Sequence, residues 1–241
     1  MRISVIVPAY NEEKLLGACL ESVTAAFAAV AAAGLEYEVI VCDNNSSDAT
    51  PRIAASAGAK VVFEPVNQIS RSRNAGAAAA AGEWMLFIDA DSKLSASTLR
   101  HLLAVMQRGL VCGGGAKVEL EGVSDLFGRL TVGTWNLISV IFRLAPGSFL
   151  FCRADAFRET GGFSAGLYAG EEIDLSSKLK RWGHEKGLGF AILPGSHLSS
   201  GRKFRLYKKT EFLRVLLLLL VKPWRTLRDP GILKYLYDGR R

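Results

Sequence analysis

Apolar residues form two kinds of segment along the first 90 residues, and the two kinds alternate. Short β-branched runs predict strands at 3–7, 37–42, 60–63 and 84–89. Longer Ala- and Leu-rich segments, with apolar residues three or four positions apart, predict helices at 12–33, 50–57 and 70–82. The run at 84–89 is apolar on both faces, which is typical of a central parallel strand. This alternation predicts an α/β protein with a mostly parallel sheet flanked by helices.

The pattern loosens after residue 110. Strands are predicted at 113–120, 148–152 and 189–193, and helices at 123–144, 153–160, 171–182 and 204–221. The segment 123–144 is unusually apolar but includes Asp125, Arg129 and Arg143, so we expect a core helix beside the sheet. A lid or lipid-facing helix near the acceptor is the alternative. With no repeat or linker in view, we expect one domain over 1–203 and a helical C-terminal appendage over 204–241.

Composition excludes two classes of protein. A chain of 241 residues with 49% hydrophobic and 22% charged residues is too apolar for a disordered one. The apolar run at 215–221 is far shorter than the roughly 20 residues that a membrane-spanning helix needs. The net charge of +7 is concentrated at the end, because 202–241 holds twelve Lys or Arg against three Asp or Glu.

That basic end suggests a partner. The leucine run lies between Arg214 and Lys222, with Trp224 close by, which is typical of a helix lying in a membrane surface. A helix docked on protein is the alternative. No nucleic-acid motif accompanies the charge, so we expect no nucleic-acid partner.

The cysteines and the N-terminus bear on location. The four cysteines (Cys19, Cys42, Cys112 and Cys152) lie far apart without a CxxC pair, which favours neither zinc nor a disulfide framework and fits a reducing compartment. The first residues do not resemble a signal peptide. We therefore expect a cytoplasmic protein whose segment 204–228 can contact the inner face of the membrane.

Polar residues follow the predicted strands, at the edge where open α/β sheets bind ligands. The segments are PAYNEE at 8–13, DNNSSD at 43–48 and DAD at 89–91. None of them contains a GxGxxG or GxxxxGK[ST] loop, which disfavours dinucleotide enzymes and P-loop NTPases. Asp89 and Asp91 can face Mg²⁺ or Mn²⁺, which also takes diphosphate oxygens. An Asx-capped turn is the alternative.

Three further groups are candidates. Arg71, Arg73 and Asn74 open the helix 70–82 and can attract phosphate, or can simply be a solvated helix start. Acidic residues open the helix 171–182, where they can complement the helix dipole or supply a general base; they are Glu171, Glu172 and Asp174. His197, after the last strand, is either a structural residue or a metal or diphosphate ligand.

Five segments, in this order, resemble family-2 glycosyltransferases. They are ISVIVPAYNEE (3–13), VCDNNSSDAT (41–50), SRSRNAGAAAAAGEWMLFIDADS (70–92), GSFLFCRADAFRETGGF (147–163) and GEEIDLSSKLKRWG (170–183). The resemblance covers about 3–200. It implies a GT-A fold and an inverting, metal-dependent transfer of a sugar, hexosyl-like, from a nucleoside-diphosphate sugar to an acceptor hydroxyl on a glycan or a lipid-linked molecule.

The resemblance also implies roles for residues. The nucleotide would be bound by Pro8, Ala9, Tyr10, Asn11, Glu12, Asp43, Arg71, Arg73, Asn74, Asp89 and Ala90. The metal would be held by Asp91, with Asp89 and His197 as further candidates. Glu172 would be the catalytic base, with Glu171 and Asp174 as alternatives. An Asp at position 43 accommodates UDP, GDP and dTDP, among which we favour UDP.

The chain departs from the family pattern at two places. Cys42 stands where many relatives carry a first Asp, and the expected base is Glu172 rather than Asp. Arg181 and Trp182 are similar to the QxxRW motif of processive synthases, but Lys178 stands at the Gln position, and we expect Trp182 to be buried by packing. The alternative functions are a non-catalytic nucleotide-sugar-binding or scaffold protein and, disfavoured by the lack of a phosphate loop, a nucleotidyltransferase.

Overall fold

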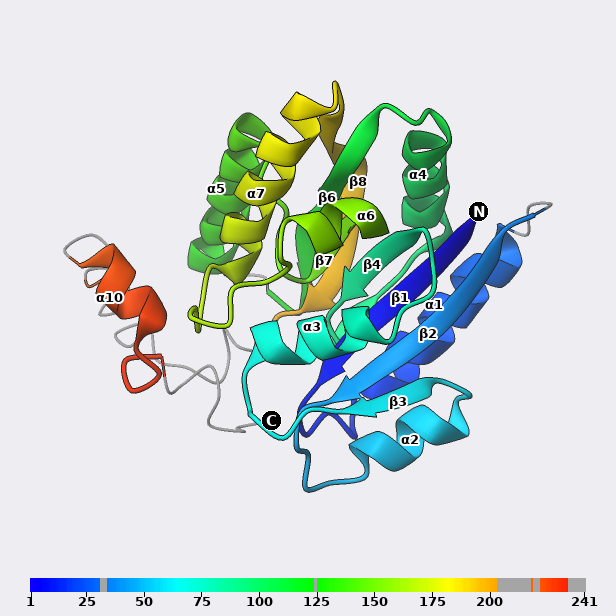
Figure 1. Cartoon of the computed structure of the whole chain (residues 1–241). Helices are drawn as coiled ribbons and strands as arrows, with labels where there is room; N and C mark the ends of the chain where they lie inside the picture. The colour runs from blue at the N-terminus through cyan, green and yellow to red at the C-terminus, as the bar shows by residue number, and fades with distance from the viewer. Residues whose placement is uncertain (31–33, 124, 203–217, 219–221, 234–241) are drawn as a thin grey trace.

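A computed structural model describes residues 1–30, 34–123, 125–202, 218 and 222–233 (Figure 1). Its centre is an eight-stranded mixed sheet in the order β3-β2-β1-β4-β7-β6-β8-β5. Helices cover both faces of this sheet. The expected α/β fold with a central sheet flanked by helices is confirmed.

The first four strands form the parallel half of the sheet. They are β1 (Arg2–Ala9), β2 (Glu36–Asp43), β3 (Lys60–Phe63) and β4 (Trp84–Ile88). The last residue of β1, Ala9, pairs with the last residue of β2, Asp43. The polar segments that follow these strands therefore emerge at one edge.

The second half of the sheet mixes directions. Strand β7 (Phe149–Arg153) runs antiparallel to both β4 and β6 (Val111–Glu121), whereas β8 (Gly189–Ser200) runs parallel to β6. The short β5 (Ser92–Lys93) pairs antiparallel with β8. Because β8 continues past Pro194 through a register shift opposite Ala116 and Lys117, His197 lies inside this strand and not after it.

Two apolar cores bind the helices to the two faces. One face packs against α1 (Leu16–Ala29) and α4 (Ala96–Gln107), and the other against α3 (Ile69–Ala78), α6 (Ala154–Glu159) and α7 (Glu171–Glu185). Alternation along β1 divides its side chains, so Val5 and Val7 enter the first core and Ile6 the second. A short helix, α2 (Thr50–Ser56), follows β2. Trp182 is buried as expected, in the second core.

Two expectations need correction. Helix α4 was not predicted, although Ser95 caps it through the Thr98 amide and Leu99, Leu102 and Met106 give it a buried stripe. Helix α5 (Leu126–Phe142), expected as a core helix, instead leaves most of its large apolar side chains exposed. Among the side chains of α5 whose burial the structure describes, the fully buried positions are Gly128 and Ser139, and most of the large apolar residues face outward.

The C-terminal appendage is described only in part. The expected helix at 204–221 lies outside the described residues apart from Leu218, while α10 (Pro223–Arg228) lies within them. The backbone amide of Tyr168 donates to the carbonyl of Leu227 at 2.8 Å, which ties α10 to the loop before α7. Among the described helices, none combines the length and the apolar character required to span a bilayer.

Two helix glycines give opposite tests of this packing. A Cβ at Gly76 in α3 would lie 2.6 Å from Cγ2 of the fully buried Ile6, so Gly76→Ala should destabilise the protein by about 1–3 kcal/mol. A Cβ at Gly133 in α5 meets nothing within 4 Å, so Gly133→Ala should add up to about 1 kcal/mol of helix propensity. Urea unfolding measures both changes, and equal stability of the two variants would contradict the packing of α3 on β1.

Candidate functional site

A cavity of about 340 Å³ lies at the carboxyl edge of the parallel strands. The ends of β1 and β4 form its floor, and α3, the start of α7 and the loop before it form its walls. Predicted site residues that line it are Pro8, Ala9, Tyr10, Glu12, Arg73, Asp89, Ala90, Asp91, Glu171 and Glu172. Further lining residues are Asn44, Asn67, Ile69, Ser72, Gly147, Ser148, Tyr168, Ala169, Gly170 and Arg202.

Arg73 crosses the back of this cavity and is almost wholly buried. Its Nη1 donates to Glu171 Oε1 at 2.7 Å, and its Nη2 donates to Asp89 Oδ1 at 3.0 Å and to the Gly147 carbonyl at 2.8 Å. The guanidinium also lies 5.2 Å from the ring centroid of Phe163. Burial alone would lower the pKa of Arg73, but Asp89 and Glu171 raise it above its ordinary value, so the side chain stays charged.

The three acidic residues at the start of α7 point to different partners. Gly170 adopts a left-handed conformation (φ 72°) and caps the helix, and Glu171 turns inward to Arg73. Asp174 instead pairs with Lys178 one turn along the helix at 2.7 Å, and it does not line the cavity. Glu172 is the acid left to face the cavity.

The environment of Glu172 favours its protonated form. Burial, and secondly the charge of Glu171, raise the pKa of Glu172 to about 8, while Arg73 acts in the opposite direction. A Cβ built on Gly147 would lie 3.1 Å from Arg73 Nη2 and 3.6 Å from Glu172 Cδ, so the missing side chain makes room for both groups. A carboxyl group that titrates near neutrality in a cavity is the type of group that acts as a general base.

Arg202 is a lining residue that the sequence did not single out. Its Nη2 donates to Glu12 Oε1 at 2.7 Å and its Nη1 donates to Glu12 Oε2 at 3.1 Å. The same Nη2 lies 3.8 Å from Asp91 Oδ2. A cation from the end of the chain thus joins the acidic residues that follow β1 and β4. The only sequence feature that pointed to Arg202 was the general excess of Lys and Arg after residue 201.

Gln68 is a second residue that was missed. Its Nε2 donates to the carbonyls of Ala165 and Leu167 at 2.8 and 2.9 Å, and its backbone amide donates to Asn44 Oδ1 at 2.9 Å. Gln68 therefore ties the end of β2 and the start of α3 to the loop that carries Tyr168 and Gly170 into the cavity.

Several predicted nucleotide-binding residues do not line the cavity. Asn11 (φ 51°) accepts the Ser47 amide, and Asp43 accepts the Ser46 amide, so both hold the loop after β2. Asn74 holds the backbone of residue 163 through its donor and its acceptor, and the exposed Arg71 donates to Gln68 Oε1. These four residues shape the surroundings of the cavity in this conformation.

His197 also lies behind the cavity wall. Its ring packs on Phe149 with centroids 5.1 Å apart, and it does not line the cavity. Burial lowers the pKa of His197 to about 4, against an opposing effect of Asp89, so the ring is neutral at pH 7.

Asp89 and Asp91 are the type of ligand that a divalent cation prefers, but both are engaged by other side chains in this structure. Asp89 is bonded to Arg73, while Asp91 accepts from the Ser199 hydroxyl at 3.5 Å and lies near Arg202. No group of three or more His, Cys, Asp or Glu side chains in the described part of the chain is placed to hold a metal ion. One or two carboxylates, completed by phosphate oxygens and water, are nevertheless the usual donor set for Mg²⁺. The side chains present therefore suit a divalent cation that arrives with a diphosphate.

Comparison with known sequences gives one family. The family model described as "Glycosyl transferase family 2" matches residues 4–156. An uncharacterized glycosyltransferase of Mycobacterium tuberculosis is 37% identical over 121 residues, which are 50% of this chain and 51% of that protein. Glycosyltransferase AglE of Haloferax volcanii is 27% identical over 194 residues, which are 73% of this chain and 60% of that protein. The match with the mycobacterial protein thus spans about half of its length.

Solved structures share the fold. Staphylococcus aureus TarS in complex with UDP-GlcNAc superimposes with a TM-score of 0.65 at 20% identity, over 99% of this chain and 71% of that one. Glucosyl-3-phosphoglycerate synthase of M. tuberculosis, with Mn²⁺, UDP and its product, gives a TM-score of 0.59 at 19% identity, over 99% of this chain and 79% of that one. At these identities the likeness establishes the fold alone.

The buried ion pairs of Arg73 can be tested by removing the charge. Arg73→Met leaves the Glu171 and Asp89 carboxylates without their shared cation, so we expect a loss of about 3 kcal/mol or more in the free energy of unfolding. Arg71→Met, on the same helix but exposed, is the matched control and should change it by less than about 0.5 kcal/mol. Urea unfolding at pH 7 gives both values. Similar small losses in the two variants would show that Arg73 does not hold these elements together.

Proposed function

Because the chain belongs to glycosyl transferase family 2, we propose that it is an inverting, metal-dependent glycosyltransferase using a nucleoside-diphosphate sugar. The observation that carries this proposal is the placement of Glu172. It faces a cavity that Asp89 and Asp91 also line, and its pKa is raised to about 8. A non-catalytic binding protein has no need of a carboxyl group held in this way.

The donor would lie along the ends of β1 and β4. Pro8, Ala9, Tyr10 and Glu12 would line the nucleotide pocket, with Asp89 against the ribose or the metal. Asn11, Asp43, Arg71 and Asn74 would take part through movement of the loops that they hold. We favour UDP as the nucleotide, because TarS was solved with UDP-GlcNAc and the mycobacterial synthase with UDP.

Mg²⁺ or Mn²⁺ would be held by Asp91 and Asp89, and Mn²⁺ in the mycobacterial synthase supports this assignment. When bound, the ion would neutralise charge on the departing diphosphate. Among the chain's own groups, Arg202 and Arg73 place two fixed positive charges at the same edge, which favours an anionic leaving group. His197 stays a predicted third ligand, one that needs a movement of its ring toward the cavity.

Glu172 would act as the base. Its carboxylate would take the proton of the acceptor hydroxyl as the hydroxyl oxygen bonds to the anomeric carbon from the side opposite the diphosphate. The bond from that carbon to the diphosphate breaks with its electron pair, and the centre inverts. Glu171, paired with Arg73, would position α7 and not take the proton, and Asp174 is engaged by Lys178.

The acceptor would be a hydroxyl on a glycan or a lipid-linked molecule, and the transferred group a hexose or a similar sugar. We assign catalysis to 1–203, while 204–228 would contact a membrane. In the described part of that segment, α10 and the residue before it expose Lys222, Arg225 and Arg228. A cytoplasmic location stays a prediction.

Substitution of Glu172 tests the assigned base. Glu172→Gln should lower the rate of transfer by about 10²–10⁴-fold while nucleotide binding is kept, because only proton transfer is lost. Asp174→Asn, on the same turn but paired with Lys178, is the matched control and should stay within a few-fold of wild type. Transfer is followed by release of the nucleoside diphosphate. An unchanged rate of transfer in Glu172→Gln would contradict the assignment of Glu172 as the catalytic base.

The pH dependence gives an independent signature of Glu172. Its carboxylate form grows as pH rises through its raised pKa, so kcat/KM of the wild type should climb toward a plateau above about pH 8. The same shift lowers stability as pH rises from about 5 to about 8, because the folded protein must ionise a group that the unfolded chain ionises more easily. Glu172→Gln should lack both the climb and this part of the stability loss.

Ligand binding tests the donor and the metal. UDP-sugars with Mn²⁺ or Mg²⁺ should raise Tm, since a ligand at 100 times its Kd adds about 2.7 kcal/mol to the native state. Asp91→Asn should lose the part of the shift that depends on the metal, whereas Asp174→Asn should keep it. GDP- and dTDP-sugars serve as comparison donors. A shift that is identical with and without metal, in both variants, would contradict the metal assignment.

A further inference from the structure

Helix α5 carries more than half of the exposed large hydrophobic residues of the described chain. Of the thirteen large hydrophobic residues that are exposed there, seven lie in this one helix of 17 residues. They are Leu126, Leu130, Leu137, Ile138, Val140, Ile141 and Phe142. Leu126 is 72% exposed and Leu130, Ile141 and Phe142 are each above 60%, so these side chains project almost freely into solvent. A helix with this many exposed large apolar residues is a candidate interaction surface.

The orientation of α5 is fixed by polar contacts on its inner face. Asn136 bonds twice with the backbone of Val118 in β6, accepting its amide at 2.9 Å and donating to its carbonyl at 2.8 Å. The buried Ser139 donates to the Leu144 carbonyl at 2.6 Å. Rotating the helix to bury its leucines would break the two bonds between Asn136 and the backbone of Val118, so this contact directs the apolar face outward.

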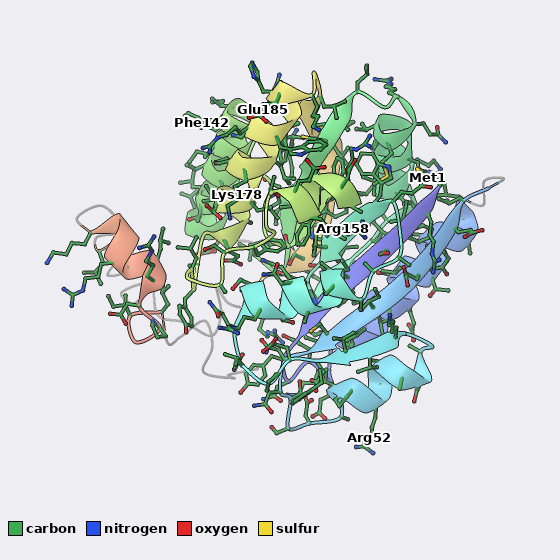
Figure 2. The ribbon with its side chains drawn as sticks, viewed as in Figure 1. Met1, Arg52, Phe142, Arg158, Lys178 and Glu185 are labelled. Carbon is green, nitrogen blue, oxygen red and sulfur yellow. The ribbon has the colours of Figure 1, made fainter. Side chains whose placement is uncertain are left out.

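The apolar face of α5 begins near the candidate active site. The preceding strand, β6, ends at Glu121, whose carbonyl accepts the Gly201 amide at 3.1 Å, directly before Arg202 of the cavity. At its far end α5 is joined to α7 by Lys180, whose Nζ donates to the Phe142 carbonyl at 2.9 Å, and Phe142 is drawn beside the last turns of α7 in Figure 2. The face therefore extends from the carboxyl edge of the sheet along the side of the molecule.

The dimensions of the patch disfavour a second copy of the chain. A helix of 17 residues is about 26 Å long, and with a width of about 12 Å it offers roughly 300 Å². A stable protein dimer buries about 800 Å² on each partner. Insertion of one helix face between lipid headgroups needs no more than this strip.

The charges near α5 fit an anionic surface. Arg129 and Arg143 flank the apolar face at its two ends, and both are exposed. Nearby acids have other functions, since Asp125 caps the helix through the Gly128 amide and Glu121 pairs with Lys93. More exposed cations lie around α10, which is tied to the loop before α7; they are Lys222, Arg225 and Arg228.

We propose that the outer face of α5 docks on the surface of an anionic phospholipid bilayer, with its aliphatic side chains inserted between the headgroups. This contact would hold the cavity mouth beside the membrane. It lies in a different segment from the basic tail, and it does not depend on the transfer reaction.

A fluorescent label tests where α5 lies when vesicles are present. The four native cysteines are all buried, so Ile141→Cys in the full chain provides a selectively labelled site on α5, and Phe63→Cys provides an equally exposed control on β3. With an environment-sensitive dye, vesicles of 70% phosphatidylcholine and 30% phosphatidylglycerol, a composition of roughly physiological charge, should blue-shift Ile141→Cys alone. No shift at Ile141→Cys, or equal shifts at both sites, would overturn the proposal.

Vesicle co-sedimentation then tests the contribution of the face. Leu130→Gln, Leu137→Gln and Ile141→Gln together should reduce the bound fraction at least about fivefold with Tm and donor-dependent turnover in solution unchanged. The control combines Val61→Gln, Phe63→Gln and Leu110→Gln, three exposed apolar residues elsewhere, and should bind as wild type. Full binding by the α5 variant would contradict the proposal. Light scattering gives a second outcome that would contradict the proposal: a wild-type dimer that dissociates in the α5 variant. It would show that the face pairs with a second copy of the chain.

Discussion

The buried guanidinium of Arg73 is the interaction on which the arrangement of the site depends. A buried charge is tolerated only when partners surround it, and here they come from three separate segments of the chain. The guanidinium belongs to α3, and it bonds the end of β4 through Asp89, the turn before β7 through Gly147 and the start of α7 through Glu171. These segments are joined to one another by long stretches of chain. A single cation therefore sets how far the first turn of α7 lies from the edge of the sheet.

The same constraint decides what the neighbouring acid can do. Consecutive residues of a helix point about 100° apart, so when Glu171 faces Arg73, Glu172 must face elsewhere. Glu172 faces the cavity, close to the positive charge of Arg73, which Glu171 partly neutralises. Burial and the negative charge of Glu171 then raise the pKa of Glu172. Adjacent carboxyl groups of the same chemistry thus acquire different properties: Glu171 is paired with Arg73, and Glu172 has a pKa raised to about 8. The difference arises from position along the helix.

Local patterns predicted the parallel half of the fold, because its buried β-branched runs and the helices between them are encoded within each segment. The polar ends of β1 and β4 were predicted for the same reason, and their residues do line the cavity. Pairings between distant segments have no such local signal: Arg202 meets Glu12 from 190 positions away, and Asn74 binds the backbone of Phe163. The outward orientation of α5 was only the alternative prediction, because apolar content alone suggests burial, whereas the bonds of Asn136 to β6 determine which face is covered.

The position of α5 follows from the mixed half of the sheet. Strand β7 is antiparallel to both β4 and β6, so β6 and its parallel neighbour β8 run in the same direction as β1 and β4. All four strands therefore end at the same edge of the sheet, and α5 begins shortly after β6 ends there. Asn136 on the inner face of α5 bonds to the backbone of β6, which leaves most of the large apolar residues on the outside, near the candidate site. An acceptor carried by a lipid would need the cavity mouth to lie close to the bilayer surface. If α5 docks on a bilayer as proposed, it would be the element that brings that mouth to the membrane surface.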